Sequence, residues 1–202
     1  MGANLKLREI IQTTFSEWLN QVAIPIYHLG GGAIYSAMNE GGKATRHCLN
    51  PFLQSECDIQ VKFGGFLDQR LLALGVPLTV HAEMKVYEKF ATHSRRSRPK
   101  ADLSIHDSSS AAPWKRTETI TDTLRAVIEI KYANYKKPDY EFGNGRIKED
   151  FDRLGGLKTD DRYLMLIDEC NRISRKNVER SREWARQSRV TVLSNNPELT
   201  SA

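Results

Sequence analysis

The sequence predicts an α/β protein in which helices flank a mixed central β-sheet. Three segments alternate apolar and polar residues with a period of two, which is typical of half-buried strands: 78–87, 101–106 and 124–132. A fourth segment, 163–167, is continuously apolar, as expected of a strand buried on both faces. Segments with helical spacing of apolar residues precede and follow these strands. Strand, hairpin, helix and strand in this order predict a sheet with antiparallel and parallel pairs.

Two helices are expected before the first strand. In residues 4–22 apolar side chains recur at spacings of three and four, and Asn4 is a suitable cap. The second helix is expected to begin at Asn50-Pro51, a capping side chain followed by proline at the first helical position, and to stop at Gly75. Gly64-Gly65 inside it disfavours a regular helix, which indicates a kink or close packing at that point.

The segment 26–43 between these helices contains two glycine clusters. A phosphate-binding loop needs Gly-x-Gly-x-x-Gly, and Tyr35 stands where the third glycine would be, so an irregular connection is expected. We therefore divide the chain into an N-terminal helical extension with its glycine-rich connection, residues 1–49, and one α/β domain, residues 50–202. After the third strand, the pattern predicts further helices at 144–157 and 174–187 and a short strand at 190–193.

Composition excludes several classes of protein. The chain has 202 residues, of which 40% are hydrophobic, enough for a sizeable core. No apolar run approaches the ~20 residues of a membrane-spanning helix, and charged residues interrupt the N-terminus where a signal peptide would be apolar. Three cysteines, none in a Cys-x-x-Cys pair, predict neither a disulfide framework nor a zinc site: Cys48, Cys57 and Cys170. We expect no membrane association and a cytoplasmic location.

The positive charge of the chain is concentrated in one segment. Lys plus Arg number 30 and Asp plus Glu 25, a formal charge of +5. Residues 170–189 contain seven basic and two acidic side chains, which accounts for all of that excess. Such a segment favours a polyanionic partner, with a solvated helix face as the alternative. If the helix reaches residue 189, four arginines form one stripe that can follow a phosphate backbone: Arg175, Arg182, Arg186 and Arg189.

A second basic cluster precedes the strand at 101–106. We expect it to steer phosphates toward that strand, although a solvated loop is the alternative: Arg95, Arg96, Arg98 and Lys100. Trp184, within the basic helix, is interpreted as a packing residue in preference to a base-stacking one. The histidines are interpreted as surface or satisfied core residues, because none has metal-ligand spacing with another His or Cys: His81, His93 and His106.

Three polar side chains of the predicted sheet can meet at one place. Glu129 and Lys131 are two residues apart and emerge on the same face, and Asp102 occupies the polar register of the strand expected to pair with theirs. Two carboxylates at one spot repel unless a cation lies between them, and Mg²⁺ suits a site with few protein oxygen ligands. A neighbouring lysine can hold a phosphate and orient or deprotonate water. Glu56 falls on the apolar stripe of its helix and is expected to point toward the core, as a further ligand or as support for one.

These residues resemble the motif of the PD-(D/E)XK nuclease superfamily. The resemblance rests on Asp102 in 99–105 and on Glu129-Ile130-Lys131, with support from the helix bearing Glu56, the helix after the third strand and the apolar strand that follows. It covers about residues 50–193 and departs from the family name at Ala101, where the family has proline.

The resemblance implies a restriction-endonuclease-like core over residues 50–202 and an endonuclease that cuts DNA, less often RNA, branched DNA being a further candidate. It implies Mg²⁺, for which Mn²⁺ can substitute, held by Asp102 and Glu129, and we expect the Ile130 carbonyl and Glu56 as further ligands. Lys131 would serve the attacking water. With Asp102, Glu129 and Glu56 it forms the expected catalytic set.

Other interpretations remain open at this point. Glu129 and Lys131 can form an ion pair on a solvated sheet face. The whole domain can be a catalytically inactive nucleic-acid-binding or assembly module on the same fold. The helix at 5–22 can serve as a partner surface, which would make a homodimer or a larger assembly. Glu83, in the polar register of the first strand, can approach the metal or be solvated.

Overall fold

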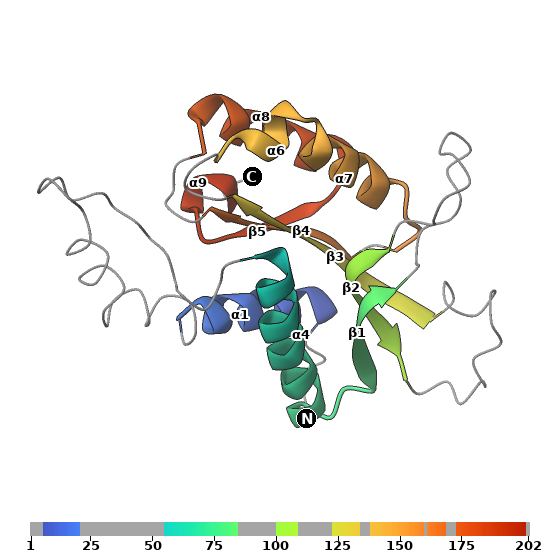
Figure 1. The fold of residues 1–202 in the computed structure, drawn as a ribbon. Coiled ribbons are helices and arrows are strands. Elements are labelled where there is room, and N and C mark those ends of the chain that lie inside the picture. The colour runs from blue at the N-terminus through green and yellow to red at the C-terminus, as the bar shows by residue number, and fades with distance from the viewer. Residues whose placement is uncertain are drawn as a thin grey trace, which may run out of the picture.

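The computed structural model describes residues 6–20, 55–84, 100–108, 123–133, 138–159, 161–168 and 173–200. They form one five-stranded sheet in the order β1-β2-β3-β4-β5 (Figure 1). β1 to β3 pair antiparallel, whereas β3, β4 and β5 run parallel. The predicted mixed α/β fold is confirmed. The strand bounds are β1 Leu78–Met84, β2 Ala101–Asp107, β3 Leu124–Ala133, β4 Asp161–Asp168 and β5 Thr191–Ser194. The predicted end of the first strand, residues 85–87, lies outside the described residues.

Helices cover both faces of the sheet. α1 (Leu7–Trp18) and α4 (Glu56–Ala73) lie on one face; α7 (Arg146–Gly155) and α8 (Arg175–Ser188) lie on the other, with the short α6 (Tyr140–Gly143) beside them (Figure 1). α9 (Pro197–Thr200) follows β5. Side chains of β3 alternate between two cores: Ile128 and Ile130 join the core under α1 and α4, and Val127 joins the core under α7 and α8. β3 is therefore buried on both faces.

α1 is part of the core and not an appendage to it. Trp18 and Phe15 are buried and pack against Phe63 of α4, with ring centroids 5.5 Å and 6.0 Å from that ring. The apolar face that suggested a partner surface is thus used within the chain, and the homodimer stays a prediction without that support. The proposed boundary at residues 49 and 50 and the predicted cap Asn4 lie outside the described residues, in which Lys6 precedes the helix.

α4 lies close to the sheet where glycine permits it. The Ser55 side chain accepts a hydrogen bond from the Asp58 N–H at 3.2 Å and caps the helix, whereas the predicted start at Asn50-Pro51 lies outside the described residues. A Cβ at Gly64 would lie 2.9 Å from Leu103 Cδ2, so helix and strand are in close contact there. Gly65 faces open space. The expected close packing is confirmed at Gly64, and Gly75 after the helix has φ +66°.

The helix predicted at 144–157 is found as α7, preceded by the single turn of α6. Gly145 separates the two, and its φ of +75° is a conformation that favours glycine. In the described part of the chain, no helix combines the length and apolar character needed to cross a membrane.

His106 is a core histidine with both ring nitrogens close to hydroxyl groups. Ser104 Oγ and Thr123 Oγ1 each lie 3.0 Å from one of them, and the ring is almost fully buried on β2. Burial and, to a lesser extent, the neighbouring His81 lower the pKa of His106 to about 4. His106 is therefore neutral at neutral pH, in agreement with its interpretation as a satisfied core residue.

We expect the free energy of unfolding to fall as the pH drops from 6.5 toward 4, in part because of His106. In this window the imidazole is protonated in the unfolded chain but not in the folded protein. The contribution of His106 to the free energy of unfolding is therefore complete above pH 6.5 and is lost as the pH falls toward 4. Urea unfolding at about pH 7 and about pH 4.5 measures the drop. His106→Gln should show a smaller drop, and an equal drop in that variant would contradict the assignment.

Candidate active site

The pairing of β2 with β3 ends next to Asp102. The backbone register runs from His106 opposite Leu124 to Leu103 opposite Ile128. Beyond that point the Ile130 N–H donates to Asp102 Oδ2 at 2.7 Å. A side-chain carboxylate has replaced a backbone carbonyl as the partner of β3, and the last part of β3 presents its edge to side chains.

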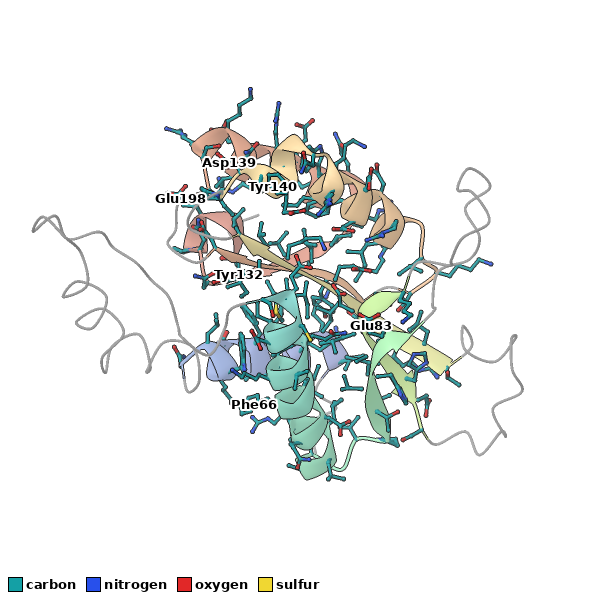
Figure 2. All side chains as sticks on the ribbon, in the orientation of Figure 1. Phe66, Glu83, Tyr132, Asp139, Tyr140 and Glu198 are labelled. Carbon is teal, nitrogen blue, oxygen red and sulfur yellow. The ribbon has the colours of Figure 1, made fainter. Side chains whose placement is uncertain are left out.

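Gln60 of α4 holds the backbone of Asp102. Its Nε2 donates to the Asp102 carbonyl at 2.6 Å and also lies 3.5 Å from Glu83 Oε1. Glu83 has φ +56°, unusual for a non-glycine residue, and pairs with Lys100 at 3.2 Å (Figure 2 labels Glu83). Glu83 and Lys100 are both exposed, so Glu83 is a solvated partner of Lys100 in this structure. Gln60 was not predicted from the sequence.

Replacing Gln60 with methionine is expected to lower the free energy of unfolding by about 1–2 kcal/mol, because the Asp102 carbonyl loses a buried donor. The matched control is Gln69→Met on the exposed side of the same helix, which should change stability by less than about 0.5 kcal/mol. Urea unfolding compares the two variants. Equal losses would show that Gln60 contributes only as a helix residue.

Lys131 connects the two helical layers at the edge of β3. Its side chain is 13% exposed, and Nζ donates to the Ile130 carbonyl at 3.1 Å. The same nitrogen lies 3.3 Å from Asp150 Oδ2 on α7 and 3.7 Å from Glu56 Oε2 on α4. The alternative of a Glu129–Lys131 ion pair on a solvated face is wrong in its premise, because this face of the sheet is not solvated.

Glu56 is the first residue of α4 and reaches the end of β3. Its Oε1 accepts from the Tyr132 N–H at 3.4 Å, and Figure 2 shows Tyr132 beside this end of the helix. The expectation that Glu56 points toward the core is wrong: its side chain is 43% exposed, because the residue opens the helix instead of lying within its buried stripe. The buried part of the Glu56 carboxylate loses contact with water, which raises its pKa. The carboxylates of Asp102 and Glu141 raise the pKa too, against the lowering effects of Lys131 and of the Tyr132 N–H.

Glu129 is turned toward α7. Its side chain is 3% exposed, and Oε2 lies 3.7 Å from Arg153 Nη2. The same guanidinium donates to Asp150 Oδ1, and the Asp150 side chain is equally buried. Asp150 and Arg153 were not predicted from the sequence. They extend the site into a continuous series of charges from α4 across β3 to α7: Glu56, Lys131, Asp150, Arg153 and Glu129.

The donor groups at this edge suit a hard cation. The predicted ligands supply only oxygen, as Mg²⁺ prefers: Asp102, Glu129, Glu56 and the Ile130 carbonyl. Among the described residues, five carboxylates and three cationic groups are linked in this charge network, with a net of two negative charges: Glu56, Asp102, Glu129, Glu141 and Asp150 with Lys131, Arg146 and Arg153. Within the ranges that the structure describes, no three His, Cys, Asp or Glu side chains are placed to hold one metal ion. The donor set fits in chemistry, while Glu129 is engaged by Arg153.

The predicted arginine stripe is only partly found. α8 ends at Ser188, and Arg189 caps it in the left-handed region with φ +55°, so it leaves the line of the helix. Arg182 Nε donates to the Glu198 carbonyl at 2.7 Å, and Arg175 pairs with Glu179 at 3.1 Å. The exposed face of α8 remains basic through a different set: Arg175, Lys176, Arg180 and Arg186. Arg95, Arg96 and Arg98 lie outside the described residues.

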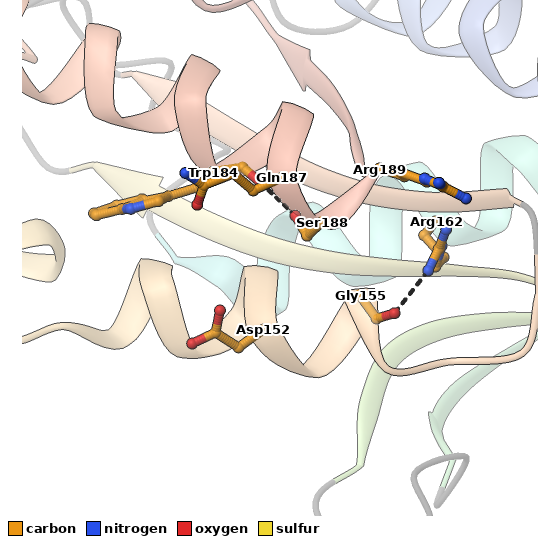
Figure 3. A pocket seen from close by; sticks show the side chains of 7 residues that line it. All are labelled: Asp152, Gly155, Arg162, Trp184, Gln187, Ser188 and Arg189. Atoms are coloured by element: carbon orange, nitrogen blue, oxygen red, sulfur yellow. Dashed lines mark hydrogen bonds between the residues drawn. The ribbon is translucent and has the colours of Figure 1, made fainter.

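A hollow of about 500 Å³ lies where α7 and α8 end (Figure 3). Arg162 lines it and donates to the Gly155 carbonyl at 2.9 Å, so this guanidinium serves the carboxyl end of α7. Trp184 lines it too, and its ring packs on Phe142 and Phe151 at centroid distances of 6.4 Å and 6.1 Å. The interpretation of Trp184 as a packing residue is confirmed.

Comparison with protein-family models, with curated proteins and with solved structures gave no match for this chain.

Proposed function

We propose that the chain is a Mg²⁺-dependent nuclease of the PD-(D/E)XK type that hydrolyses phosphodiester bonds in DNA as an endonuclease. The order of elements supports the proposal. A helix with an acid at its start, three antiparallel strands, a helix and a parallel apolar strand follow one another as the resemblance requires: α4, β1, β2, β3, α7 and β4.

One observation carries the proposal: carboxylates and an ammonium converge on the part of β3 that extends beyond its described pairing with β2. Asp102 binds the Ile130 N–H, Lys131 binds the Ile130 carbonyl, and Glu56 binds the Tyr132 N–H. These groups come from three elements far apart in sequence. An ion pair serving stability alone would not need two carboxylates and an ammonium around one stretch of backbone. Phosphodiester hydrolysis uses carboxylates for a cation and a positive group for the phosphate.

Each residue has a role that its position supports. Asp102, Glu129, the Ile130 carbonyl and Glu56 would hold the cation, which would polarise a water molecule and offset charge developing on the phosphate. Lys131 Nζ, placed between α4 and α7, orients the attacking water and balances the phosphate charge. Gln60 keeps Asp102 in place by donating a hydrogen bond to the backbone carbonyl of Asp102. The exposed basic face of α8 and the cluster that includes Lys100 provide attraction for a phosphate backbone.

The alternative is a catalytically inactive nucleic-acid-binding or assembly module on the same fold. It is favoured by the ion pairs that already engage Glu129 and Lys131. A module of this kind needs the basic surface but neither a cation nor a water-orienting lysine.

A cleavage panel separates the two functions. Purified protein is incubated with linear, circular, single-stranded and branched DNA and with RNA, in Mg²⁺, in Mn²⁺ or with a chelator. We expect DNA cleavage in either metal and none with the chelator; cutting of circular DNA identifies an endonuclease, and Glu129→Gln is the inactive control. If no nucleic acid is cut in either metal, the nuclease proposal fails. Salt-sensitive DNA binding without cleavage would then select the inactive module.

A further inference from the structure

One buried carboxylate on β3 and another on α7 share the guanidinium of Arg153. Glu129 and Asp150 have side chains only 3% and 4% exposed. Anions so far from water require a counter-charge, and Arg153 contacts both of them. Lys131 is the other cation in contact with Asp150, and its Nζ is also shared with Glu56 and the Ile130 carbonyl. Among the described residues, Arg153 is therefore a counter-ion in direct contact with Glu129.

Of the two cations Arg153 and Lys131, Arg153 is the more exposed to water. Its side chain is 29% exposed, about twice the exposure of Lys131, and it belongs to the last turn of α7. A long side chain at the end of a helix can swing outward without moving backbone. The distance from Arg153 to Glu129 is long, at 3.7 Å. The contact of Arg153 with Glu129 is therefore weaker than its contact with Asp150 and is the easier of the two to break.

We infer that Arg153 occupies Glu129 as a resident counter-ion that a divalent cation must displace. This inference rests on the proposed function, because it takes Glu129 as a ligand of the catalytic cation. A dication and a guanidinium on the same carboxylate repel each other in a site with little water. Binding of the cation at Glu129 thus releases Arg153 from that carboxylate, and Arg153 lowers the affinity of the site for metal until it is displaced.

As a consequence, Arg153 regulates the binding of metal at Glu129. Without metal, Arg153 neutralises Glu129 and stabilises the fold across β3 and α7. With metal, Asp150 keeps Lys131 in position while the released guanidinium lies beside the cation site, where it can meet a phosphate of the substrate. In this scheme Arg153 controls access of the cation to Glu129 and is not itself a ligand of the cation.

The test is metal binding by the full chain, measured by isothermal titration calorimetry with Mn²⁺ after chelator treatment and dialysis. Arg153→Gln removes the charge and leaves an amide that can donate to Asp150. It is expected to lower the Kd for Mn²⁺ by about fivefold or more. Lys148→Gln is the matched control, because it removes the same charge from the exposed side of the same helix, and its Kd should stay within about twofold of the unaltered protein.

The outcomes are distinguishable. If Arg153→Gln binds Mn²⁺ with unchanged or higher Kd while Glu129→Gln abolishes binding, the inference fails and the proposed cation site stands. If the unaltered protein binds no Mn²⁺ and Arg153→Gln binds none either, both fail. Should Arg153→Gln not fold, NMR of the arginine Nε–Hε groups in the unaltered protein decides: faster solvent exchange of Arg153 on saturation with Mg²⁺ supports displacement, and unchanged exchange overturns it.

Discussion

Replacing Lys131 with methionine is expected to slow DNA cleavage by about a thousandfold and to leave DNA binding within about threefold of the unaltered protein. Methionine keeps most of the buried stem but has no charge to orient water or to balance the phosphate. DNA affinity should persist because the exposed basic side chains of α8 are untouched. Cleavage rates under single-turnover conditions, with binding measured in Ca²⁺, check the two parts separately.

The matched control for this variant is Lys148→Met. Lys148 is an exposed residue of α7 that pairs with Asp152, so its loss removes the same charge near the site without touching β3. Its cleavage rate should stay within about twofold of the unaltered protein. Because Lys131→Met leaves Asp150 with fewer positive neighbours, urea unfolding must show that the variant is folded. A folded Lys131→Met that cuts DNA at the normal rate would remove lysine from the mechanism.

Replacing Trp18 with alanine is expected to cost about 3–5 kcal/mol in the free energy of unfolding. The indole is fully buried, and its ring centroid lies 5.5 Å from that of Phe63 and 6.2 Å from that of Phe15. Alanine would leave a cavity between α1 and α4 that the neighbouring rings cannot fill. Equilibrium unfolding in urea measures the loss.

Glu9→Ala on the exposed side of α1 is the control, with an expected change below about 0.5 kcal/mol. A loss below about 1 kcal/mol for Trp18→Ala would mean that α1 is the extension that the sequence suggests and not part of the core. A full loss would mean that the domain begins before residue 50.

The strands were predictable because their pattern is local. Apolar residues alternate along β1, β2 and β3, and the predicted starts at 78, 101 and 124 agree with the strands found. The same parity argument placed Asp102, Glu129 and Lys131 near one another. It could not show that Asp102 would bind the Ile130 N–H or that Glu129 would turn to α7, because both depend on where the helices pack.

Two further residues of the site carry a signal in the sequence. Asp150 lies in the apolar stripe of α7, which consists of Ile147, Phe151 and Leu154. Gln60 lies beside the buried stripe of α4 in the same way. A polar side chain in an apolar stripe needs a partner in the core, and that rule, applied to Glu56, would have identified both. For Glu56 it failed, because the described helix begins at that residue.

The end of α8 had no such signal. Helices commonly end in a glycine with positive φ, whereas here Arg189 takes that conformation and the Val190 N–H donates to the Ala185 carbonyl at 3.0 Å. The arginine spacing alone therefore predicted one residue too many on the stripe. The spacing also could not show that Arg182 would donate a hydrogen bond to the Glu198 carbonyl.

The close contact between Gly64 and Leu103 sets how near α4 lies to β2 beside the site. Gln60 and Glu56 lie one and two turns before Gly64 on α4, and Leu103 is the neighbour of Asp102. Because a helix is stiff over two turns, the gap between helix and strand at Gly64 is passed on to both polar residues. The absence of a side chain at Gly64 thus sets the distance between helix and strand. The distances from Glu56 to Lys131 and from Gln60 to Asp102 therefore depend on how closely the core packs at Gly64, as well as on the polar groups themselves.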